Sequence, residues 1–304
     1  MWFHFFLLCG TCPFAGKVFH LYYTRPETIL QYGKNCKKIV QTLQKCVKNR
    51  KKTVKKTVFV VSEDKKEECT EYENDRLAIY TSVWGNYDKI MEPIIKGPNC
   101  DYYIITDQEI PNKSIWKKIE PKNQPEGFAT WHPAIKNRYY KMHPHEIFKE
   151  YEYSIYIDGN VRPVTDLYPF LIHMKKHHKE FALFRHPIFD CLYDSAEHLK
   201  KIELVDSSVM DLQVEKYRLQ EFPEKFGFFE CGLILRKHHV MKCQRAMETW
   251  WNEYQNGVKR DQQSFTYALW KNGIDTSDVC ILGDNIRENS RIKLNNHKRK
   301  QQKV

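Results

Sequence analysis

The chain has 304 residues, of which 41% are hydrophobic and 14% aromatic, so a full core is possible and a largely disordered chain is excluded. The formal net charge is +11, but ten Lys/Arg without one acid fall in residues 34–56 and six more in residues 291–304. These sixteen charges exceed the total, so the rest of the chain is net acidic. That distribution argues against a specific nucleic-acid-binding domain, whose charge would lie on a folded face.

Residues 1–74 differ in pattern from the rest of the chain. Met1–Gly16 is apolar, although it lacks the positive flank and cleavage site of a signal peptide. Apolar residues of Cys36–Val47 recur at helical spacing and predict a basic amphipathic helix. Val58–Val61 is a short possible strand, and a charged linker leads from it to a domain boundary near Asp75. Solvated chain ends and peripheral contact with an anionic membrane both fit these basic segments.

Location in the cell is predicted from the same terminus. If Met1–Gly16 inserted in a membrane, all nearby positive charge would lie on its C-terminal side, which keeps the main domain in the cytoplasm. We therefore expect a cytoplasmic protein or one on the cytoplasmic face of a membrane. The alternative is the Golgi lumen, with the N-terminus as a signal anchor.

Strand-like and helix-like segments alternate from Leu77 onward. The expected strands are Leu77–Val83, Tyr102–Thr106, Tyr153–Ile157, Phe181–Phe184, Phe228–Leu235 and Val279–Leu282. The expected helices are Pro133–Met142, Asp166–His178, Ser207–Gln220, His239–Tyr254 and Asp261–Trp270. This alternation predicts an α/β domain over residues 75–290, with a mostly parallel central sheet covered by helices on both faces, followed by a basic tail at residues 291–304.

Ligands of such sheets bind outside the carboxyl ends of the strands. There, the apolar strand Tyr153–Ile157 delivers Asp158-Gly159-Asn160. Oxygen ligands two residues apart suit Mg²⁺ or Mn²⁺. The alternative is a plain turn, because Asp-Gly and Gly-Asn are both turn signals, and taken alone this motif favours the turn. The ten cysteines are scattered, and we expect most to be reduced and buried. Adjacent histidines such as His177-His178 make poor metal clamps, because neighbours on a helix do not face the same way.

Several motifs that occur in a fixed order favour a functional interpretation of the Asp158 turn over a plain turn. They are Tyr80–Ser82, Gly85–Asp88, Asn137–Lys141, Ser154–Asn160, Arg185–Pro187, Glu230–Gly232 and Arg260–Phe265. Their order resembles GT-A glycosyltransferases around the D-x-D motif. More closely, the chain from Leu77 to Trp270 resembles the GT-A-like family first catalogued as a domain of unknown function. That family includes plant mucilage and pectin glycosyltransferases and proteins described as alkaline-ceramidase-like.

The resemblance implies a GT-A-like (Rossmann-like) fold, a nucleotide-sugar donor, and Mn²⁺ or Mg²⁺ as cofactor. A cation would stabilise the departing diphosphate without a proton donor. The implied metal ligands are Asp158, Asn160 and His297; a neutral Asn in place of the second Asp predicts weaker metal binding. The implied donor-binding residues are Tyr87, Asp88, Arg138, Lys141, Arg185 and His186. A solvated helix face is the alternative for Arg138 and Lys141.

Two carboxylates compete for the role of catalytic base toward the acceptor hydroxyl, Glu230 and Asp261. The alternative for Asp261 is a helix N-cap. The sequence leaves the choice between them open, as it does the stereochemical outcome.

The leading hypothesis is a metal-dependent glycosyltransferase acting on a glycan or lipid-linked acceptor. The family label also raises a ceramidase-like lipid amidase, but the chain has neither an H-E-x-x-H pattern nor a G-x-S-x-G elbow. A third hypothesis is a non-enzymatic protein that binds polyanions through its basic ends.

Overall fold

The computed structural model describes residues 3–5, 19–21, 75–122 and 124–296. The chain divides into two units, Met1–Cys69 and Thr70–Val304. In the first, β1 (Phe3–Phe5) pairs antiparallel with β2 (Phe19–Leu21). The predicted helix at residues 36–47 and the possible strand at residues 58–61 lie outside the described residues. None of the described helices combines the length and hydropathy that a bilayer-spanning segment needs.

A seven-stranded sheet forms the centre of the second unit, in the order β10-β8-β9-β6-β3-β4-β5. Six of the strands run in one direction and β9 runs against its neighbours β6 and β8. The strands are β3 (Leu77–Val83), β4 (Cys100–Thr106), β5 (Lys117–Lys118), β6 (Tyr153–Ile157), β8 (Phe181–Arg185), β9 (Phe229–Lys237) and β10 (Val279–Gly283). The predicted α/β class with a mostly parallel sheet is confirmed.

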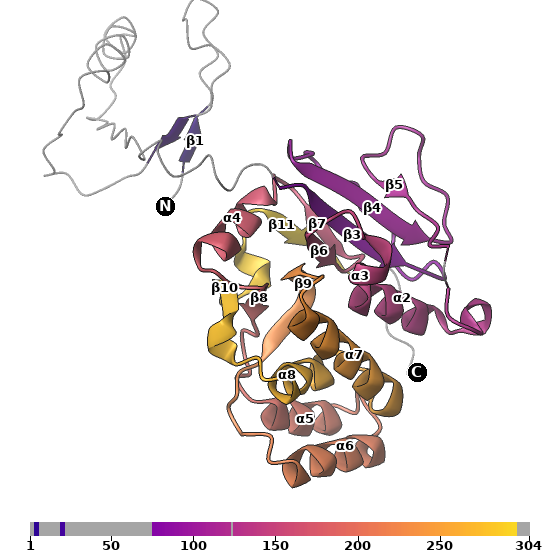
Figure 1. The fold of residues 1–304 in the computed structure, drawn as a ribbon, viewed down its shortest axis with the longest axis vertical. Helices are drawn as coiled ribbons and strands as arrows, with labels where there is room; N and C mark the ends of the chain where they lie inside the picture. The colour runs from indigo at the N-terminus through magenta and orange to yellow at the C-terminus, as the bar shows by residue number, and fades with distance from the viewer. Residues whose placement is uncertain (1–2, 6–18, 22–74, 123, 297–304) are drawn as a thin grey trace, which may run out of the picture. The chain divides into compact units, whose positions relative to one another are not determined.

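Helices cover both faces of this sheet, as predicted (Figure 1). Alternate side chains of a strand point to opposite faces, so Ala78 and Tyr80 enter one core while Leu77 and Ile79 enter the other. On the first face the core is completed by α2 (Pro133–Met142), α7 (Met241–Asn256) and α8 (Gln262–Lys271). On the second face it is completed by α4 (Tyr168–Lys176).

Several short elements were not expected. They are η1 (Phe128–Thr130), α3 (Pro144–Ile147), β5, β7 (Val161–Pro163), α5 (Leu192–Lys201), η2 (Thr276–Asp278), η3 (Ile286–Glu288) and β11 (Ile292–Leu294). Helix α5 packs on the expected α6 (Ser207–Leu219). Its buried residues Leu192, Ala196 and Leu199 recur at i, i+4 and i+7, so the sequence did carry a signal for it.

The described part of the basic C-terminal segment belongs to the folded domain. Strand β11 pairs antiparallel with β7, Ile292 opposite Pro163 and Leu294 opposite Val161. Beyond the strand, the Asn295 backbone N–H donates to the Asn160 carbonyl oxygen at 2.9 Å. The boundary predicted at residue 290 therefore falls short of the structure, because this strand is too short and too charged to show a clear alternating pattern.

Candidate active site

The turn after β6 stands at the carboxyl edge of the sheet, where sequence predicts it. Strand β9 runs antiparallel to β6, so its early residues lie beside this turn: the Asp158 N–H donates to the Gly232 carbonyl at 2.9 Å. The Val161 N–H donates to the Asp158 carbonyl at 2.9 Å and closes the turn. Position 159 requires glycine because β3 lies close to the turn: a Cβ there would lie 2.9 Å from Val83 Cγ2.

A buried ion network connects this turn to α2 and α8. Lys141 Nζ lies 3.3 Å from Asp158 Oδ1 and 2.6 Å from Asp261 Oδ2, and its side chain is 1% exposed. The same Asp261 oxygen lies 3.0 Å from Arg138 Nε. The solvated-face alternative for Lys141 is therefore wrong. Its ammonium group is shared between two carboxylates, and its expected contact with the donor stays a prediction.

Arg236 fixes the end of α2 that carries Lys141. Its fully buried guanidinium donates to the Lys141 carbonyl at 2.5 Å and to the Tyr80 hydroxyl at 2.6 Å. The Tyr80 hydroxyl in turn donates to the Tyr140 carbonyl at 3.1 Å. These contacts satisfy carbonyl groups that a helix end leaves unpaired, and they hold Lys141 at a fixed place over the sheet.

Asp261 is the N-cap of α8, and its Oδ1 accepts the Gln262 N–H at 3.2 Å. Burial opposes its ionisation, but the positive charges of Arg138 and Lys141 outweigh burial and hold the pKa of Asp261 well below its usual range. A carboxylate with so low a pKa accepts protons poorly. The structure thus disfavours Asp261 as the catalytic base and supports the N-cap reading together with a role as counter-charge.

Glu230 has the opposite electrostatic setting. Its pKa is raised, first by burial and also by the charge of Asp158, while nearby Arg287 lowers it. Gln262 Nε2 donates to Glu230 Oε2 at 3.2 Å and orients the carboxylate. Of the two predicted bases, Glu230 has the properties that proton abstraction requires.

The two oxygens of Asp158 have different surroundings. Oδ1 accepts the Tyr156 hydroxyl at 2.9 Å and faces Lys141, while the side chain as a whole remains 28% exposed. Oδ2 borders the space above Gly232: a Cβ built on that glycine would lie 3.6 Å from Oδ2 and 3.6 Å from Ile286 Cδ1. A side chain at position 232 would therefore contact this carboxylate oxygen, and glycine leaves it without that contact.

The other two expected metal ligands are less well placed. Asn160 Nδ2 donates to the Asn295 carbonyl at 3.1 Å, so its amide group helps to attach the segment after β11. His297 lies outside the described residues. Within the described ranges, Asp158 is not part of a group of three His, Cys, Asp or Glu side chains whose ligand atoms lie within 4.8 Å of one another.

The loop after β3 approaches the Asp158 turn, as expected for a nucleotide-binding loop. Asp88 is buried, and its Oδ2 lies 3.2 Å from where a Gly159 Cβ would stand. Tyr87 is half-buried, and its N–H donates to the Trp84 carbonyl at 3.3 Å. The loop bends at Gly85 (φ +64°), whose N–H donates to the Asp107 carboxylate at 3.0 Å.

Arg185 and His186 lie at the end of β8, at the same edge of the sheet, and both side chains make contacts within the protein. Arg185 pairs with Asp284 at 2.8 Å in an exposed ion pair. His186 Nδ1 accepts the Phe189 N–H at 3.1 Å, and burial lowers the pKa of its ring. This nitrogen therefore helps to organise the turn, and the expected donor contact of His186 stays a prediction.

Sequence reasoning missed four residues of this site. Tyr156 and Gln262 orient the carboxylates, Asn295 holds Asn160, and Arg287 adds positive charge near Glu230. Tyr156 and Gln262 lie inside motifs quoted above, so their positions were available but their contacts were not. Arg287 and Asn295 come from the C-terminal segment that folds back onto the edge, which no local pattern indicates.

The α/β sheet and its carboxylate-lined edge point to the class of glycosyltransferase-like domains. The comparison with protein families agrees, and the chain belongs to the family described as TOD1/MUCI70, glycosyltransferase-like domain, which matches residues 33–297. The match begins well before Leu77, so it includes part of the N-terminal segment that the quoted motifs left out.

Individual relatives are more distant. The chain is 30% identical over 166 residues to a probable hexosyltransferase MUCI70 of Arabidopsis thaliana, a match that covers 50% of this chain and 27% of that protein. Among solved structures, the mannosyltransferase Ktr4p of S. cerevisiae has a TM-score of 0.39 at 10% identity, covering 86% of each chain. Mouse xyloside xylosyltransferase 1 has a TM-score of 0.37 at 10% identity, covering 68% of this chain and 84% of its own.

Proposed function

We propose that this protein is a glycosyltransferase that moves a sugar from a nucleotide-diphosphate donor to a hydroxyl of a glycan or lipid-linked acceptor. One observation carries the proposal: a partly exposed carboxylate, Asp158, stands at the carboxyl end of a central strand, with Gly232 and Glu230 on the neighbouring strand. Family membership supports the reaction class, and the relative named as a probable hexosyltransferase supports a hexose as the transferred sugar.

The residues present fit a divalent cation. Asp158 Oδ2 borders the space over Gly232, and carboxylate oxygen is the donor type that Mg²⁺ and Mn²⁺ prefer. We expect Asp158 to hold the ion, with the Asn160 oxygen as a second contact. When bound, the ion would neutralise the negative charge that develops on the leaving diphosphate. Lys141 beside Oδ1 already offsets part of the Asp158 charge, which favours weak metal binding.

Different side chains of the site would bind the donor, accept the proton and position the carboxylates. The loop with Tyr87 and Asp88 would receive the base and ribose, and the exposed Arg287 at the edge would contact the diphosphate. Glu230 would take the proton of the acceptor hydroxyl as it attacks, since its raised pKa makes it the stronger base of the two carboxylates. Arg138 and Lys141 hold Asp261 and Asp158 in place beneath the ligand.

The two other hypotheses have less support. The ceramidase-like amidase rests on the family label alone, and the chain has neither an H-E-x-x-H pattern nor a G-x-S-x-G elbow. A protein that only binds polyanions through its basic ends would not need the carboxylates Asp158 and Glu230 at the edge of the sheet. Cellular location and membrane contact stay predictions, because they rest on residues 1–74.

The test measures nucleotide release from a panel of nucleotide sugars, with Mn²⁺ and with a chelator, for the wild type and two variants. Asp158→Asn keeps the side-chain size but removes the charge. Gly232→Ala adds a methyl group at ordinary contact distance, 3.6 Å from Asp158 Oδ2, so the fold should tolerate it while the space is filled. We expect both variants to lose release by about 10²-fold or more, as for other groups that stabilise developing charge.

The matched control is Asp211→Asn, which removes an exposed carboxylate paired with Lys200 on the surface of the α5–α6 pair. If the Asp158→Asn variant released nucleotide as fast as the wild type, the proposal would be contradicted. Release at the wild-type rate by the Gly232→Ala variant would contradict it as well.

A further inference from the structure

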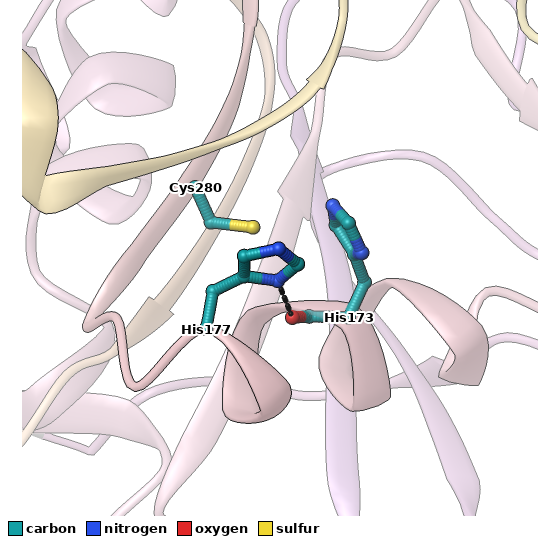
Figure 2. Close-up of side chains that lie close together, drawn as sticks. All are labelled: His173, His177 and Cys280. Carbon is teal, nitrogen blue, oxygen red and sulfur yellow. Dashed lines mark hydrogen bonds between the residues drawn. The ribbon is translucent and has the colours of Figure 1, made fainter.

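Three metal-ligating side chains converge far from Asp158, between α4 and β10 (Figure 2). His173 and His177 lie one turn apart on α4, and Cys280 is the second residue of β10. One ligand atom from each lies within 4.8 Å of the others; in the described part of the chain, this is the one such group of three. Neighbouring His177 and His178 could not form this clamp, but the i, i+4 pair faces one side of the helix.

One of the two histidines, His177, is held in a ligating arrangement. His177 Nδ1 lies 2.8 Å from the His173 carbonyl oxygen, which can only accept, so Nδ1 carries the proton and Nε2 keeps its lone pair. In Figure 2 this second nitrogen lies on the side of the Cys280 sulfur. A hydrogen bond from the non-ligating nitrogen to a carbonyl is the usual device that fixes a metal-binding imidazole.

The backbone around all three residues is fixed as well. Helix α4 ends at a left-handed residue, His178 (φ 52°), and the Lys179 N–H donates back to the Met174 carbonyl at 3.2 Å. Cys280 is 4% exposed, has a free thiol, and stands opposite Ala182 in the parallel β10–β8 pair. The two imidazoles are exposed, so an ion can reach the cluster from solvent.

We propose that His173, His177 and Cys280 bind Zn²⁺, with water as the fourth ligand. Two imidazoles and one thiolate form a donor set that zinc prefers over Mg²⁺ or Ca²⁺. Zinc bonds to nitrogen and sulfur place ligand atoms about 3.5 Å apart. A rotation of the exposed His173 ring closes the remaining distance without any movement of the backbone.

This site is separate from the proposed sugar-transfer site. Cys280 lies in β10, which β8 and β9 separate from β6, and its register corresponds to Ile155 in the middle of β6, before the strand end that carries Asp158. Strand β10 is at the end of the sheet and leads into η3 and β11. Zinc would tie this edge strand to α4 and so anchor the segment that carries Ile286 and Asn295 to the Asp158 turn.

The experiment uses the full chain without a histidine tag, stripped of metal with a chelator. Zn²⁺ is titrated in competition with a chromophoric chelator, and Co²⁺ is then added as a spectroscopic substitute. We expect one zinc per wild-type chain, and a cobalt–thiolate charge-transfer band. Cys280→Ser should lose that band, and both Cys280→Ser and His173→Ala should weaken zinc binding by at least about tenfold.

Two matched controls separate this site from its surroundings. His178→Asn removes a histidine next to His177 that lies outside the cluster and keeps a residue type that tolerates the left-handed backbone at this position. Asp158→Asn removes the proposed donor-site ligand; both variants should bind zinc as the wild type does. His173 is exposed, so His173→Ala tests the proposal even if the buried Cys280→Ser fails to fold. Absence of saturable zinc binding in the wild type, or unchanged binding in His173→Ala, would overturn the proposal.

Discussion

Lys141 shows at the level of a single residue how burial changes the meaning of a charge. Its sequence context, a lysine three positions after Arg138 on a helix, is typical of a solvated face. In the structure it is 1% exposed and joins two acids of the site. A buried cation is stable only with compensating partners, and so Asp158, Asp261 and Lys141 depend on one another.

The first prediction concerns Asp261→Asn. Removing one partner of a buried pair should lower the free energy of unfolding by about 3 kcal/mol, the lower end of the usual range because Lys141 keeps Asp158. The folded-state pKa of Asp261 lies below its ordinary value of 3.8, so its stabilisation is complete above that value and is lost as the pH falls through the folded-state pKa. Urea unfolding should therefore show a difference that is constant between about pH 7 and about pH 5 and shrinks as the pH falls below about 4. A difference that grows with acidification would contradict this account.

The second prediction concerns the pH dependence of transfer. A base acts only when deprotonated, and burial raises the pKa of Glu230 above its ordinary 4.5, so the acid limb of the rate profile should lie above that value. Glu230→Gln should lower the rate about 10²- to 10⁴-fold and abolish this limb. Glu224→Gln, which changes an exposed acid paired with Arg218, serves as the control. An unchanged acid limb in the Glu230 variant would assign the base to another group.

Asp158 and Glu230 were predicted as site residues from the sequence because each follows or interrupts an apolar strand, and strand ends are where ligands bind. The choice between Glu230 and Asp261 could not be made there. It depends on which carboxylate Arg138 and Lys141 contact, and that is decided by the packing of α2 against α8 and the sheet.

At the level of elements, the reversed strand β9 builds the site. A parallel neighbour would have placed Glu230 and Gly232 at the far edge, whereas β9 runs against β6 and brings both beside Asp158. The sequence predicted the strand itself but not its direction, because hydrophobic patterning carries no information on strand polarity. Similarly, β7 and β11 are too short for their pairing to be predicted.

The third prediction tests the connection from β3 to α2. Gly85 has φ +64°, and a Cβ there would lie 2.7 Å from Pro133 Cγ, the first residue of α2. Gly85→Ala should lower the free energy of unfolding by more than the about 1–2 kcal/mol that left-handed strain alone costs. Gly273→Ala is the control, because Gly273 has φ +67° and a Cβ there would meet no atom within 4 Å. If urea unfolding gave equal decreases in unfolding free energy for the two variants, the contact with Pro133 would contribute nothing to stability.

At the level of the whole molecule, different parts of one sheet have separate tasks. Its faces bury two apolar cores, its carboxyl edge carries the Asp158 network, and its last strand, β10, carries the His173–His177–Cys280 cluster together with α4. The α/β class was predictable because strand and helix patterns alternate along the chain. The cluster was not, since its three ligands come from two elements about a hundred residues apart.

The central claim is that Asp158 binds the cation that holds a nucleoside diphosphate. The most direct measurement is calorimetric titration of the full-length protein with uridine and guanosine diphosphates, with and without Mn²⁺. We predict saturable binding of one of them in the presence of Mn²⁺, and a loss of at least about tenfold in affinity for Asp158→Asn, since a charge-assisted contact of about 1.5–3 kcal/mol is removed. Binding of equal strength to the wild type and Asp158→Asn would contradict the claim.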